Sequence, residues 1–136
     1  MTVPTITEMR EALATVIDTV PGIRGAPAWP ERPNPPVAIV AGPDVDYNED
    51  TQSDRYTFAV IVLVSDSVTR AATLLLDSFL AGAGASSIRA ALEADDTLGG
   101  VVQYLVVTAI RDYGTQVVQS TEYLGATLMV EAVAYR

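Results

Sequence analysis

The residues best suited to bind a ligand are the closely spaced acids of the stretch "PDVDYNEDTQSDR", residues 43–55. Asp44, Asp46, Asn48 and Asp50 stand at alternate positions, the spacing of the first four ligands in an EF-hand calcium loop. Such a loop also needs glycine at its sixth position and glutamate at its twelfth. This chain has Glu49 and Arg55 there, and strand-like segments flank the stretch. The pattern therefore favours a solvated acidic loop, residues 42–54, over a calcium-binding module, which is kept as an alternative.

The chain contains no histidine and no cysteine, so it lacks the usual general bases, thiolate nucleophiles and zinc ligands. Catalysis would depend on carboxylates, and the adjacent acids Asp95 and Asp96 are typical of a hydrated helix end. The stretch "AGAGASS" lacks the lysine of a P-loop and follows a predicted helix. We predict no enzyme, no metal and no cofactor. A small enzyme with carboxylate catalysis is an alternative.

The composition indicates one soluble domain, residues 1–136, with 49% hydrophobic residues and a net charge of −9. Every basic residue is an arginine, and the arginines are scattered singly, so no basic patch is available to grip nucleic acid. The longest uncharged run, residues 97–110, is too short to span a bilayer. The N-terminus has no signal-peptide pattern. We expect a protein made in the cytoplasm, with no membrane partner.

Periodic apolar residues predict three helices. Residues 5–20 begin with Thr5 and Glu8 at capping-box spacing and end at Pro21-Gly22. Residues 66–81 have a narrow polar stripe and are apolar around most of the circumference. A short third helix, "SIRAALEAD", places Arg89 and Glu93 four residues apart, where their side chains pair.

Four strands are expected at residues 37–41, 55–65, 101–111 and 122–135. The second of these is apolar on both faces, which indicates that both faces are covered. A turn at "DYG", residues 112–114, joins the last two strands into an antiparallel hairpin. Residues 21–36 hold most of the eight prolines and predict an extended connector anchored by Trp29.

These elements predict an α+β fold: a mainly antiparallel sheet of about four strands, two main helices packed on one face, and a short third helix. With the helices on one face, little of the chain is left to shield the apolar residues on the other. We therefore expect partner subunits to cover that face.

Several stretches together resemble the tail terminator proteins of long-tailed bacteriophages. They are the first helix with its proline-rich link into "PPVAIV", the strand "RYTFAVIVLVS", the helix "RAATLLLDSFL", and "SIRAALEADDTLGGVV" leading into a hairpin that ends "EYLGATLMVEAVAY". The resemblance spans nearly the whole chain and includes no catalytic motif. The arginine-only basic set and the alanine and valine content suit a siphophage of a high-GC actinobacterial host.

The resemblance implies a structural virion protein at the head-proximal end of the tail. Members of that family form a homo-oligomeric ring of six copies that caps the tail tube, ends its polymerisation and joins it to the head-completion or neck protein. Genomic DNA passes through the ring without specific binding, and the negative charge of this chain suits such a channel. We expect the acidic residues to face the lumen or an axial contact: Asp44, Asp46, Glu49, Asp50 and Asp54. Another neck component, a head–tail joining or tail-completion protein, is the alternative.

Overall fold

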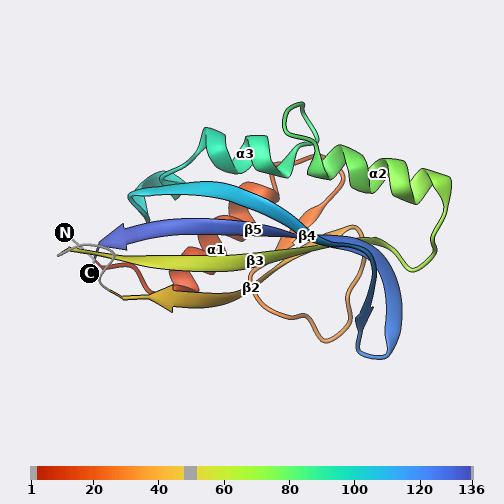
Figure 1. The fold of residues 1–136 in the computed structure, drawn as a ribbon, viewed down its shortest axis with the longest axis horizontal. Coiled ribbons are helices and arrows are strands. Elements are labelled where there is room, and N and C mark those ends of the chain that lie inside the picture. The colour runs from red at the N-terminus through yellow and green to blue at the C-terminus, as the bar shows by residue number, and fades with distance from the viewer. Residues whose placement is uncertain (1–2, 48–51, 136) are drawn as a thin grey trace.

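The computed structural model describes residues 3–47 and 52–135 (Figure 1). The elements in chain order are α1 (Ile6–Ile17), β1 (Arg24–Ala26), β2 (Val37–Asp46), β3 (Ser53–Ser65), α2 (Arg70–Leu80), α3 (Ile88–Ala94), the 3-10 turn η1 (Leu98–Gly100), β4 (Tyr104–Val118) and β5 (Thr121–Tyr135). The strands form a five-stranded sheet in the order β1-β2-β3-β5-β4, in which only the β1–β2 pair is parallel. The predicted α+β class is confirmed. The extra strand, β1, lies inside the predicted connector.

The three helices enclose the main core against one face of the sheet. Helix α1 packs on β1 and β2, α2 packs on β3 and β5, and α3 packs on β4. In Figure 1, α1 crosses behind the strands, and α3 and α2 follow one another along the β4 side. Phe58 of β3, Leu13 of α1 and Phe79 of α2 are fully buried between these layers. The core is thus built by the apolar stripes that the sequence shows.

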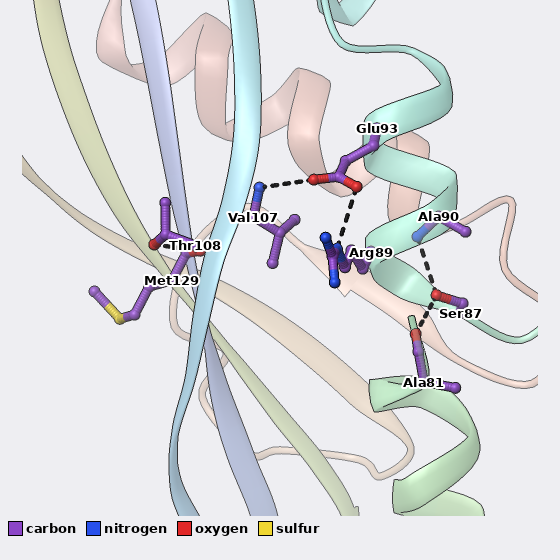
Figure 2. Close-up of polar contacts among 8 residues, drawn as sticks. All are labelled: Ala81, Ser87, Arg89, Ala90, Glu93, Val107, Thr108 and Met129. Carbon is purple, nitrogen blue, oxygen red and sulfur yellow. Dashed lines mark hydrogen bonds and ion pairs between the residues drawn. The ribbon is translucent and has the colours of Figure 1, made fainter. Parts of the chain in front are cut away.

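Side-chain caps fix where the helices begin. Thr5 Oγ1 accepts a hydrogen bond from the Glu8 amide at 3.0 Å, as the capping spacing predicts. Thr69 Oγ1 accepts from the Ala72 amide at 3.1 Å, so α2 begins at Arg70 and the predicted start at residue 66 is too early. Ser87 Oγ accepts from the Ala90 amide at 3.0 Å and donates to the Ala81 carbonyl, which ties the start of α3 to the end of α2 (Figure 2).

The hairpin turn lies at Gln119 and Ser120, and the predicted turn at residues 112–114 is wrong. Both turn residues have positive φ, 52° and 67°, as a tight two-residue hairpin requires. Asp112 and Gly114 also have positive φ, but they occupy a bulge where the β4–β5 register shifts. A bulge uses the same turn-forming residues to bend a strand without reversing it. Figure 1 shows the hairpin curling away from the rest of the sheet beyond this point.

The face of the sheet that points away from the helices, here the outer face, carries a second apolar cluster. Its buried members are Val37, Ile39, Leu63, Val118 and Tyr123. The curled hairpin brings the last two residues over the first three, and the proline-rich segment 27–36 closes the same side. Within that segment Pro33 is buried, and the Pro30 carbonyl accepts a hydrogen bond from Gln119 Nε2 at 3.3 Å. Both faces of β3 are therefore covered at this end by the chain itself.

Because the chain itself covers this part of the outer face, partner subunits are not needed to shield it. The accessible surface is 7017 Å², against about 6,800 Å² expected for a folded monomer of this mass. The protomer thus buries as much surface as an ordinary monomer, and the expectation of partners cannot rest on an uncovered sheet. The proline-rich connector, which the sequence predicts only as an extended segment, folds onto this face and supplies part of its cover. If the protein assembles, the contacts between copies must involve side chains that stay exposed in the protomer.

Candidate functional site

Two of the predicted site residues, Asp44 and Asp46, lie on β2 and not in a loop. The ladder continues past a bulge between Ala41 and Asp44, pairing Asp44 with Thr57 and Asp46 with Arg55. The predicted loop 42–54 is therefore too long, since β2 runs to Asp46 and β3 begins at Ser53. Acidic residues are compatible with a strand at this position because β2 is solvated on its outer face there.

Among the described residues, Asp54 does not join these two acids in one cluster. Asp54 belongs to β3 and is 5% exposed, on the opposite face from its neighbour Arg55. Asp54, expected near the lumen or an axial contact, therefore presents little surface to a channel or a partner in the protomer. Glu49 and Asp50 lie outside the described residues. Asp44 and Asp46 thus form the described part of the acidic site.

The alternate spacing that suggested calcium ligands has a different cause in the structure. Alternate residues of a strand point to one side at intervals of about 7 Å, and they do not wrap around a cation as the ligands of an EF-hand do. Within residues 3–47 and 52–135, no three His, Cys, Asp or Glu side chains gather as a metal site would require. Asp95, the other acid considered for chemistry, accepts a hydrogen bond from the Gly99 amide at 3.1 Å beyond the end of α3.

A groove between the helices and the edge strand β4 is the most distinctive apolar surface feature. This α2–β4 groove holds about 200 Å³ and is lined by Leu80, Gly82, Arg89, Val107, Thr108, Ala109, Ile110 and Leu128. Its chemistry is mostly apolar, with one guanidinium. Ile110 is 48% exposed although it lines an apolar surface. One exposed apolar side chain is common on a protein surface, so the groove is informative only together with its apolar neighbours.

A polar network holds one end of the groove in place (Figure 2). Arg89 Nε donates to Glu93 Oε1 at 3.2 Å, which confirms the predicted pair. The other oxygen of Glu93 accepts from the Val107 amide at 3.3 Å. This bond satisfies a main-chain donor on β4, which forms an edge of the sheet, and it fixes α3 beside the strand.

Further exposed side chains with large apolar area lie on α2 and β4, the two elements that give the groove its name. Leu74 is 57% exposed and Tyr113 is 50% exposed. Tyr113 Oη donates to Asp77 Oδ1 at 2.5 Å, and Asp77 is one helical turn from Leu74, so these groups adjoin one another. Sequence reasoning did not select these residues. The sequence did indicate an exposed apolar surface here, because the helix predicted at residues 66–81 is apolar around more of its circumference than one packed face requires.

Two tyrosines have perturbed ionisation. Burial raises the pKa of the Tyr56 phenol above its ordinary value of 10.0, and the charges of Asp54 and Tyr47 raise it further. The hydrogen bond to Asp77 raises the pKa of Tyr113. Neither group ionises near neutral pH, so both act as uncharged donors and packing groups there.

The raised pKa of Tyr56 predicts an alkaline transition. A folded-state pKa above the unfolded value means that the stabilisation is fully present below about pH 10 and is lost as pH rises through the folded-state pKa. We expect phenolate absorbance of the wild type to show a late component above pH 10 that Tyr56→Phe reduces and that Tyr56→Phe combined with Tyr113→Phe removes. A late component of unchanged size in Tyr56→Phe would contradict the assignment.

No protein-family model matches this chain, and no curated protein matches its sequence. In the described part of the chain, no helix has both the length and the apolar character needed to cross a membrane. The candidate functional features of this chain are the groove, the exposed apolar residues around it and the acidic end of β2.

Proposed function

We propose that the protein is a phage tail terminator, a structural protein that forms a ring on the head-proximal end of the tail tube. The ring ends tube polymerisation and supplies the surface that the head-completion or neck protein binds. Its action is geometric: docking on the last tube ring buries the surface on which the next ring would stack. The sequence resemblance described above is the source of this assignment.

The observation that carries the proposal is the group of exposed apolar residues around the α2–β4 groove. Leu74, Ile110 and Tyr113 are each about half exposed on a protomer whose total surface is that of a well-packed monomer. Apolar residues that gather on one side of a stable protomer are typical of a protein-binding surface. This supports an assembly role, and it replaces the open sheet as the reason to expect partners.

The acidic residues support a channel that DNA traverses. Asp44 and Asp46 are exposed on the outer face, and the chain carries a net charge of −9. Like charge repels the phosphate backbone, so DNA passes such a surface without being held. Asp54 is buried in the protomer and is left out of this surface.

Tail length provides the direct test. The gene is interrupted in the phage genome that carries it, and tails are measured by electron microscopy. We expect tubes of variable and excessive length that are not joined to heads, and normal tails when the gene is supplied in trans. Tails of normal length that fail to join heads would instead identify a different neck component. Normal infectious particles would exclude a role in tail assembly.

Neutralising the acidic surface should slow DNA release without preventing tail assembly. The variant combines Asp44→Asn, Asp46→Asn, Glu49→Gln and Asp50→Asn. The matched control removes four exposed charges elsewhere: Glu11→Gln, Asp66→Asn, Asp96→Asn and Glu122→Gln. We expect slower ejection for the first variant only, because the channel then repels DNA less. Equal ejection rates for both variants would leave these acids without a role in the channel.

A further inference from the structure

The single tryptophan of the chain is not packed inside the protein. Trp29 is 51% exposed, so only about half of the side chain predicted to anchor the proline-rich connector is covered. Pro33 of the same segment is buried. A tryptophan is the side chain with the most apolar area to bury and is enriched at the centres of protein interfaces. Its position at the surface therefore indicates a contact that the protomer does not make by itself.

The segment that carries Trp29 is held firmly at its base. Prolines at positions 27 and 30 flank the tryptophan. The Pro30 carbonyl accepts a hydrogen bond from Gln119 Nε2 at 3.3 Å, and Arg24 Nη2 donates to the Asn34 carbonyl at 3.2 Å. Proline also restricts the backbone. We call the proline-rich segment 27–36 the arm. Because it is preorganised, it loses less conformational entropy on binding than a flexible segment would.

We propose that Trp29 of one copy docks in the α2–β4 groove of a second copy. This inference rests on the proposed function and names the contact between neighbouring subunits of the ring. The groove volume, about 200 Å³, is below the range of roughly 300–1,000 Å³ for small-molecule sites. It suits one large side chain. Ile110, which is 48% exposed, supplies the main apolar contact for the indole, above the buried Leu80 and Leu128.

Charge complements this fit. Arg89 lies at the groove, where its guanidinium can stack on an indole face. Glu31 is exposed two residues beyond Trp29. Arg89 uses Nε for Glu93, and its remaining N–H groups are suited to a carboxylate such as Glu31 of the docked arm.

The contact must join two molecules because the two surfaces lie on opposite sides of one. The arm leads into β2 and covers the outer face, whereas the groove lies between the helices and β4, at the other edge of the sheet. Figure 1 shows the proline-rich loop and the helices α2 and α3 on opposite sides of the strands. A contact between two different surfaces of identical chains is heterologous, and it produces a ring or a filament rather than a two-fold dimer.

Complementation between two variants tests this contact. Trp29→Ala keeps the groove, and Ile110→Glu keeps the arm. Each alone should weaken self-association by about thirtyfold or more, the loss typical of an interface hot spot. Mixed together, they should form a complex through the one intact contact. Its tryptophan emission, which comes only from the Ile110→Glu copy, should shift to the blue.

Val117→Glu is the control, because it places a charge on an exposed residue of β4 outside the groove. It should associate as the wild type does. An unshifted emission in the mixture would overturn the docking contact. If the wild type forms rings in electron micrographs but the mixture shows no emission shift, the proposed function is retained and the contact is rejected. A shifted emission together with normal tail length after gene interruption would retain the contact and reject the terminator role.

Discussion

Gly125→Ala is expected to destabilise the protein by about 3 kcal/mol or more, the upper part of the range for overpacked cores. A Cβ at this position would lie 2.2 Å from the Val62 carbonyl oxygen and 3.0 Å from Leu63 Cδ2. The carbonyl belongs to β3, which pairs with β5 at this point. β3 cannot move away without breaking its hydrogen bonds to β5, so no small adjustment makes room for the added methyl group. The free energy of unfolding in urea measures the effect.

Gly82→Ala is the matched control. There the nearest atom to an added Cβ is Arg89 Nη1 at 3.7 Å, an ordinary contact with a flexible side chain. We expect a change within about 1 kcal/mol, with a gain favoured by the lower entropy of the unfolded chain. Similar losses for the two variants would mean that close packing of β5 on β3 is not what selects glycine at position 125.

Leu63→Ala is expected to cost about 2–5 kcal/mol, the range for truncating a buried leucine. Leu63 is fully buried in the outer cluster with Val37 and Ile39. Because the proline-rich segment closes this cluster, the cavity should also loosen residues 27–36. Hydrogen exchange in that segment should therefore accelerate more than in α1, and urea unfolding gives the total loss.

Val60→Ala separates the local effect from general destabilisation. Val60 lies on the same strand but is buried in the main core, on the opposite face. Its truncation should lower the free energy of unfolding. Hydrogen exchange in residues 27–36 should then accelerate only as much as global unfolding does. Equal loosening of that segment by both variants would contradict the view that the outer cluster holds it in place.

Much of the fold follows from local patterns in the sequence. The cap at Thr5, the two apolar faces of β3 and the Arg89–Glu93 pair are all confirmed, because each depends on residues close together in the chain. The errors arise where a local signal has two structural uses. Residues 112–114 carry turn chemistry that the structure uses for a bulge, and the true turn uses Gln119 and Ser120, which are less typical of a hairpin.

The candidate site was less predictable because it depends on long-range placement. The acids of residues 42–54 are contiguous in sequence, but the strand period separates Asp44 and Asp46 from buried Asp54. The groove joins Leu80, Ile110 and Leu128 from three different elements. No spacing rule brings such residues together. The exposure of Trp29 likewise depends on how the connector folds back over the sheet.

The position of β5 has a consequence for protein synthesis. This strand comes last among the elements, yet it lies between β3 and β4 in the sheet. While a ribosome is still making residues 121–135, β3 has no strand neighbour on that side, and the backbone groups that later pair with β5 stay open. Sequential folding of the earlier elements cannot complete this sheet, so the nascent chain depends on delayed closure, or on a chaperone, to avoid aggregation.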